Sequence, residues 1–231
     1  YVRSPVDVYI HPDQNSMVKF TSVDDPSKWL VGLAVNDDEI HIVSPLDPPG
    51  NHSKESIYEG LVHELVHICV AKMLPSRLPL WLNEGLAVFY AKQRQFARQV
   101  PGIIRGMNQL PSLSDLEDQK YFERNNGYSL SYTIVEFIIS EYGQAGLKEF
   151  LIDYPDYQSL GIMSDMQLEN AWHRYLSRKY LDPEPIQRWQ ENRENIFEAS
   201  LFPNPISDEA KLEFFTGTDG TFSLRVLDPW G

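Results

Sequence analysis

Two histidines and a glutamate stand in the order His63-Glu64-Leu65-Val66-His67, a spacing that suits metal-assisted hydrolysis. Residues four apart on a helix lie one above the other on the same face, so the two imidazoles can hold one metal ion from one side. Glu64 then projects beside the metal, where its carboxylate can take a proton from a bound water. The pattern alone is a moderate signal, and the surrounding residues decide what it means.

The segment from Ser53 to Leu74 has the character of a buried helix. It contains no proline, Ser53 is a suitable N-cap, and Pro75 ends it. Histidines and a glutamate in the middle of such a helix are costly to bury unless something binds them. Gly60 shares their face one turn earlier and keeps it open. Apolar side chains cover nearly the whole circumference, which predicts burial: Ile57, Leu61, Val62, Leu65, Val66, Cys69, Val70 and Met73.

A third metal ligand can come from one of two known arrangements. The metzincin arrangement needs glycine at position 70 and histidine at position 73, but this chain has Val70 and Met73. The gluzincin arrangement takes a glutamate from the next helix, and Glu84 stands 17 positions after His67. The intervening prolines leave room for a chain reversal, so Glu84 would complete the site with water in the fourth position. The alternative is a solvated glutamate near a helix N-terminus.

The motif and its flanks resemble the gluzincin metallopeptidases of the small, peptidase MA-like type. The resemblance covers roughly residues 5 to 155 and implies a zinc-dependent peptidase, with Zn²⁺ held by His63, His67 and Glu84 and with Glu64 as general base. Besides the histidine motif it rests on Leu-Pro-Leu-Trp-Leu-Asn-Glu-Gly-Leu-Ala at 78–87, the strand-like segments 28–34 and 39–45, and Tyr-Ser-Leu-Ser-Tyr at 128–132 leading to 141–143.

Two positions depart from that family's pattern. The interval from His67 to Glu84 is a little shorter than in the large gluzincin families. Val88 stands one turn after Glu84, where some members carry an acidic partner for a ligand histidine. That partner must therefore come from elsewhere, for instance from a backbone carbonyl.

A tyrosine is implied as a further catalytic residue. In the resembled family a phenol from the helix after the ligands stabilises the tetrahedral oxyanion, and Tyr128 is the matching candidate. Tyr132, one turn later, is the alternative. For both residues the other interpretation is a core aromatic ring with its hydroxyl at the surface.

We expect the segment from Glu39 to Val43 to be an edge strand, which could pair with an extended peptide and hold it across the metal. The remaining histidines are expected at the surface and outside the metal site: His11, His41, His52 and His173.

Composition limits the partners. The 231 residues include 33 acidic and 20 basic ones, and the net charge of −13 argues against nucleic acid and anionic membrane surfaces. A peptide or protein substrate that is neutral or basic is weakly favoured. Cys69 is the single cysteine, so no internal disulfide is possible. No apolar run is long enough to span a bilayer, and the oligomeric state is left open.

Two other functions fit the same residues. A non-catalytic zinc-binding scaffold or binding module would keep the metal fold, although loss of the glutamate is its mark and Glu64 is present. A hydrolase of a non-peptide amide is also compatible. A zinc metallopeptidase is the main prediction because it uses every residue of the motif.

The predicted fold is α+β, with a small N-terminal β-sheet followed by helices. Residues 103–124 are expected to loop around the site. The predicted elements are strands at 6–10, 32–35 and 39–43, the last two a hairpin, and helices at 13–20, 53–74, 129–142, 144–153, 163–180 and 184–197.

We expect a catalytic domain at residues 1–197 and a β-rich element at 198–231, in which 210–215 and 221–227 form a hairpin. The sequence Phe-Pro-Asn-Pro at 202–205 resembles the start of a type IX secretion sorting domain of exported bacterial proteins, here truncated. The alternative is a plain hairpin packed on the catalytic domain. With a chain that begins at Tyr1 rather than Met, we expect a processed protein that is secreted or at the bacterial cell surface.

Overall fold

The structure is a computed structural model, and its backbone divides into two units. The first comprises Tyr1–Met73 with Asn192–Gly231, and the second comprises Leu74–Glu191. None of the described helices combines the length and the apolar character that a membrane crossing requires. The described residues are 5–22, 30–36, 38–74, 76–161, 164–181 and, for the backbone alone, 198–202, 211–215 and 224–227.

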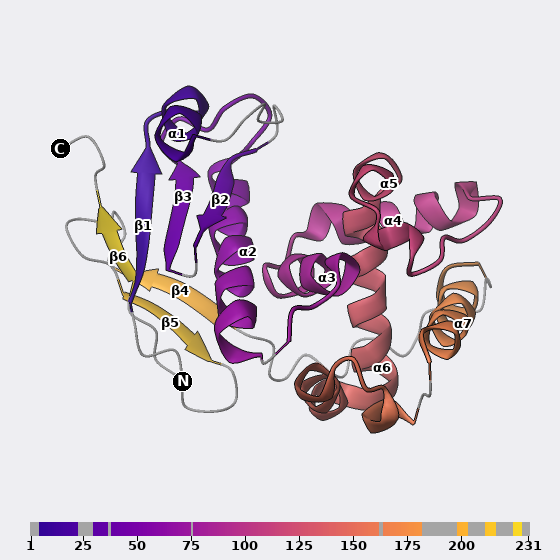
Figure 1. Cartoon of the computed structure of the whole chain (residues 1–231). Helices are drawn as coiled ribbons and strands as arrows, with labels where there is room; N and C mark the ends of the chain where they lie inside the picture. The colour runs from indigo at the N-terminus through magenta and orange to yellow at the C-terminus, as the bar shows by residue number, and fades with distance from the viewer. Residues whose placement is uncertain are drawn as a thin grey trace. The chain divides into compact units, whose positions relative to one another are not determined.

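The first unit is built on a mixed sheet with the strand order β2-β3-β1-β6 (Figure 1). β3 runs antiparallel to β2 and parallel to β1, and β6 runs parallel to β1. The expected hairpin is confirmed, and Asn36 turns it with a φ of 57°. The strands are β1 (Val6–His11), β2 (Gly32–Val35), β3 (Glu39–Val43) and β6 (Leu224–Leu227).

The prediction that residues 39–43 form an edge strand is wrong. β1 pairs with every residue of β3, so β3 lies inside the sheet. β2 is an edge among the described strands. The sequence could not show this, because the parallel partner of β3 lies about thirty residues earlier in the chain.

Two helices accompany this sheet, α1 (Gln14–Thr21) and α2 (Lys54–Met73), and α2 lies beside β2 and β3 (Figure 1). Ser53 acts as the predicted cap of α2, because its Oγ accepts a hydrogen bond from the Ser56 amide at 3.2 Å. Burial is confined to the middle of α2, and Met73 is 63% exposed, so the expected burial of the whole helix is wrong at its end. The core between α2 and the sheet contains Val6, Val8, Ile40, Ile42, Ile57, Leu61, Leu65 and Ile68.

The C-terminal strands pair differently from the prediction. β4 (Glu198–Phe202) and β5 (Lys211–Phe215) form an antiparallel pair, whereas β6 joins β1. The predicted hairpin between 210–215 and 221–227 is therefore wrong, because β6 instead extends the edge of the sheet that β1 would otherwise leave open. Most of the Phe-Pro-Asn-Pro segment and the helix predicted at 184–197 lie outside the described residues. The domain boundary near residue 197 stays a prediction.

The second unit is helical. The helix break predicted between 142 and 144 is confirmed, because α6 is kinked at Gly143, whose φ of 71° and ψ of 179° are almost confined to glycine. The prediction of loops over 103–124 is wrong in part, since α4 ends only at Gly106 and α5 is helical. The elements are α3 (Leu80–Tyr90), α4 (Arg94–Gly106), η1 (Asp115–Glu117), α5 (Gln119–Arg124), α6 (Gly127–Asp153), η2 (Gln158–Leu160), α7 (Asp165–Leu176) and η3 (Ser177–Leu181).

Candidate metal and catalytic site

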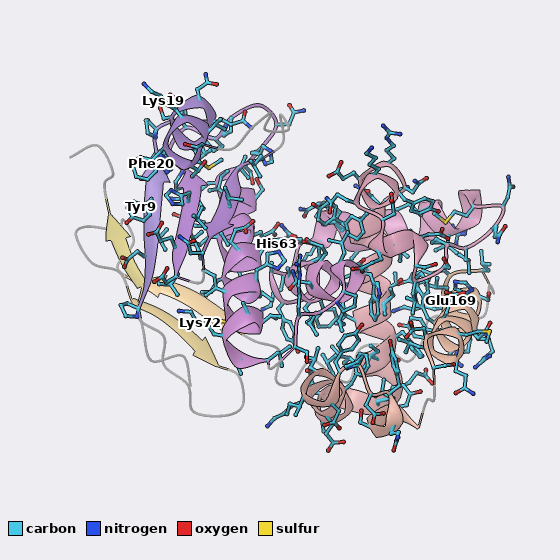
Figure 2. All side chains as sticks on the ribbon, in the orientation of Figure 1. Tyr9, Lys19, Phe20, His63, Lys72 and Glu169 are labelled. Atoms are coloured by element: carbon cyan, nitrogen blue, oxygen red, sulfur yellow. The ribbon has the colours of Figure 1, made fainter. Side chains whose placement is uncertain are left out.

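The two histidines of the motif lie one turn apart in the middle of α2, where Figure 2 labels His63. Their ring centroids are 4.8 Å apart, and the rings meet edge to face at 83°. His63 is only 9% exposed and His67 is half-buried. The helix thus holds two imidazoles on one face, as the spacing predicts.

Glu64 turns toward the edge strand of its own unit. Its Oε2 accepts a hydrogen bond from the backbone amide of Ala34 in β2 at 2.9 Å. The Glu64 side chain also lies against Gly32, because a Cβ built at Gly32 would be 3.5 Å from Glu64 Cγ. The sequence gives no sign of this contact, since a backbone amide is present at almost every residue.

Glu84 is half-buried on α3, and the start of this helix is capped from a distance. Pro79 precedes the helix and provides no side-chain cap of its own. Instead, Glu117 Oε2 accepts a hydrogen bond from the Leu80 amide at 2.7 Å. A carboxylate at a helix N-terminus satisfies an amide that has no partner within the helix and also interacts favourably with the helix dipole.

Gly85 sets how closely α3 approaches α6. A Cβ at Gly85 would lie 2.5 Å from the carbonyl oxygen of Ser131 and 3.0 Å from Val135 Cγ2. Only glycine therefore permits this approach. Because Glu84 is the preceding residue, the contact also fixes the rotation of the helix that carries it.

The three predicted ligands come together. His63, His67 and Glu84 each offer one ligand atom, and these atoms all lie within 4.8 Å of one another. Two imidazoles and one carboxylate form a donor set that catalytic zinc sites use, with a fourth position kept for water or substrate. The residues present therefore fit a zinc ion. Val88, which stands where some members of the resembled family carry an acidic partner for a ligand histidine, is fully buried and provides no such partner.

Tyr128 and Tyr132 have different surroundings on α6. The Tyr128 ring stacks on Phe96 at 5.3 Å and meets Phe122 edge to face at 5.0 Å. The Tyr132 hydroxyl instead donates a hydrogen bond to Glu136 at 3.1 Å. Burial, together with the charge of Glu136, raises the pKa of Tyr132. The Tyr132 hydroxyl is thus engaged by Glu136, and the catalytic role of Tyr128 stays a prediction.

Glu136 is the centre of a network that sequence reasoning missed. Tyr175 and Tyr180 donate hydrogen bonds to its Oε2 at 3.0 and 2.7 Å, and the Lys179 ammonium lies 2.7 Å from its Oε1. These partners connect α6 with α7 and η3, at sequence separations of 39 and 44 residues for the two tyrosines. A largely buried carboxylate is stabilised by such donors, so the network has a structural role.

Two histidines expected at the surface are buried. His11 is 0% and His41 1% exposed, so that expectation is wrong for this pair. His11 Nε2 lies 2.9 Å from His41 Nδ1, and His41 Nε2 lies 3.5 Å from Glu39 Oε2. Burial, with a smaller effect of His41, lowers the pKa of His11 to about 4. Burial also lowers the pKa of His41, against an opposing effect of Glu39.

These rings are buried because α1 covers their face of the sheet. Tyr9 stacks on His41 at 4.7 Å, and Phe20 of α1 lies 5.4 Å from both histidine rings (Figure 2). His52 and His173 are half-buried, and His173 Nε2 lies 2.9 Å from the carbonyl oxygen of Pro111. None of these four histidines belongs to the metal cluster.

Comparison with known proteins identifies one family. A sequence model described as the Peptidase MA superfamily matches residues 1–160 of the chain. The matched range contains the whole cluster and Tyr128. No curated protein and no solved structure matches the chain.

Proposed function

Because the chain belongs to the Peptidase MA superfamily, we propose that it is a zinc-dependent metallopeptidase that hydrolyses peptide bonds with Glu64 as general base. The observation that carries the proposal is the cluster of His63, His67 and Glu84, whose ligand atoms lie within 4.8 Å of one another. Zinc bound there would polarise the scissile carbonyl and make a bound water more acidic.

Glu64 supplies the proton transfers. Its carboxylate accepts a proton from the attacking water while the new C–O bond forms, and it passes that proton to the leaving amine as the C–N bond breaks. The hydrogen bond from Ala34 engages Oε2, so Oε1 is the oxygen available for this exchange. Glu64 follows His63 directly in α2, which supports its place beside the metal.

Tyr128 is the proposed second donor to the tetrahedral oxyanion. Its ring is fixed by Phe96 and Phe122. Gly127, directly before it, also packs against Phe122 with no room for a Cβ. These contacts hold the start of α6 in place, which is what a positioned hydroxyl requires.

β2 provides an edge for an extended substrate. It is paired only with β3 among the described strands, so the main-chain groups on its other side, apart from the Ala34 amide that Glu64 engages, can add a peptide strand by hydrogen bonds. This replaces β3, which was the strand expected for that role. The net charge of −13 favours neutral or basic peptides over acidic ones.

The test is a peptide-library digest together with metal analysis, on the wild type and on Glu64→Gln. The wild type should contain one zinc per chain and cleave peptides, whereas Glu64→Gln should keep its zinc and lose cleavage. Zinc without cleavage by the wild type would favour the scaffold function. Cleavage of a non-peptide amide, without cleavage of peptides, would favour a hydrolase of non-peptide amides.

A further inference from the structure

We propose that the main-chain amide of Ala34 is the positioning group for Glu64, and that it holds one carboxylate oxygen so that the other can carry the proton. This inference rests on the proposed function for its role in catalysis. The contact itself lies within one unit of the structure, since β2 and α2 both belong to the first unit.

The Ala34 amide points away from β3, toward the outer edge of the sheet. Leu33 and Val35 are the partners of His41 and Glu39 in β3, and the Val43 amide donates to the Val31 carbonyl at 2.9 Å. In an antiparallel pair the residues between such hydrogen-bonded partners turn their amides and carbonyls to the opposite side. Ala34 therefore presents its N–H on the outer edge of β2, and Glu64 Oε2 accepts it at 2.9 Å.

Gly32 and Ala34 of β2 together define where the Glu64 side chain lies. Its Cγ lies over Gly32, where an added Cβ would be 3.5 Å away, and its carboxylate reaches the amide two residues further on. Ala34 also packs against the apolar core between α2 and the sheet. The donor is thus part of a fixed strand, not of a side chain that must itself be ordered.

A glutamate has several rotatable bonds, and holding it in one rotamer opposes its conformational entropy. A hydrogen bond to a carboxylate is stronger than one between neutral groups and can hold the side chain in place. With Oε2 engaged, Oε1 is left for the proton of the water. Any residue except proline would provide the same donor at position 34, which is why the sequence does not reveal it.

The first arm of the test needs no substrate. Amide hydrogen exchange is followed by NMR for Ala34, Leu33 and Val35 in the wild type and in Glu64→Ala. The Ala34 amide should exchange roughly tenfold faster in the variant, while Leu33 and Val35 keep their rates because their amides face β3. An unchanged Ala34 rate would overturn the proposal.

The second arm removes only the donor. Replacing residue Ala34 by lactic acid exchanges its amide for an ester and keeps the side chain. We expect kcat to fall at least tenfold on any peptide that the wild type cleaves, with KM within about twofold and one zinc still bound. An ester variant with wild-type kcat would overturn the proposal.

A double variant separates positioning from a general structural effect. Glu64→Asp shortens the side chain so that it no longer reaches the amide, and the ester should then lower the residual kcat no further. An equal loss in both backgrounds would show that the amide acts only on the strand, which would also overturn the proposal. If the wild type cleaves no peptide, the proposed function fails, and the exchange arm still decides whether Ala34 holds Glu64.

Discussion

Two pairs of histidines lie on opposite sides of the sheet in the first unit, and they are arranged for different chemistry. His63 and His67 lie on α2, which packs against the face that carries Val8 and Ile40. His11 and His41 lie on the other face, under α1. The first pair is spaced along a helix and faces a carboxylate ligand, whereas the second pair forms a hydrogen bond to itself at 2.9 Å.

The difference shows that a metal site is defined by where the ring nitrogens point, not by burial. In the second pair, one ring nitrogen must donate and the other must accept, so the two nitrogens that face each other are satisfied without an ion. In the first pair, the rings meet edge to face, and one ligand atom of each ring lies within 4.8 Å of a Glu84 carboxylate oxygen. We therefore expect zinc binding to depend on His63 and His67, and the loss of stability in acid to depend on His11 and His41.

The largest expected effect is on catalysis at the first pair. Glu64→Gln should lower kcat by about 10²–10⁴-fold, because glutamine cannot accept the proton of the water. Zinc content and the circular-dichroism spectrum should remain those of the wild type. Comparable turnover by wild type and variant would remove Glu64 from the mechanism.

Metal removal should lower stability through the first pair alone. A ligand bound only to the native state stabilises it by about 3–4 kcal/mol when its concentration is several hundred times its dissociation constant. A chelator should therefore lower the free energy of unfolding by a similar amount, measured by urea denaturation. His11→Gln should show the same chelator effect as the wild type. Loss of the effect in that variant would mean that the two pairs are not independent.

Acidification should destabilise the protein through the second pair. The folded-state pKa of His11 is about 4, below its usual 6.5, so the unfolded state binds more protons between these values. The contribution of neutral His11 to the free energy of unfolding is then fully present above pH 6.5 and is lost as the pH falls toward 4. Between pH 7 and 5 the free energy of unfolding should fall by about 2 kcal/mol.

Urea denaturation with chelator present measures this effect without the contribution of zinc. Replacement of His11 by phenylalanine should reduce the slope of stability against pH, whatever it does to stability at pH 7. An equal slope in that variant would show that other groups cause the acid sensitivity.

A smaller effect is expected where α3 is fitted to α6. Gly85→Ala places a Cβ 2.5 Å from the Ser131 carbonyl oxygen, so α3 must move and take Glu84 with it. Overpacking of this kind costs about 1–3 kcal/mol, and zinc affinity should fall as well. Gly102→Ala is the matched control, because an added Cβ there meets nothing within 4 Å. Equal effects of the two substitutions would show that close packing at Gly85 is not what positions Glu84.

Local patterns predicted the parts of the site that a single element provides. The motif helix with its Ser53 cap, the hairpin around Asn36 and the helix break at Gly143 all depend on residues within a few positions of one another. α4 was missed, although Phe96, Val100 and Ile104 recur every four residues and give one apolar face.

The contacts that the sequence did not predict join distant segments. The central position of β3 depends on β1, and β6 pairs with β1 from the other end of the chain. The amide that holds Glu64 is 30 residues before it, and His11 and His41 are also 30 residues apart. Such pairings follow from tertiary packing, for which periodicity within one segment contains no information.

The central claim is that one zinc is bound through His63, His67 and Glu84. The direct test is the zinc content per chain, measured on purified wild type, His63→Ala and His11→Ala under the same conditions. The wild type and His11→Ala should each contain one zinc per chain, and His63→Ala should lose most of its zinc. Stoichiometric zinc in His63→Ala would contradict the claim.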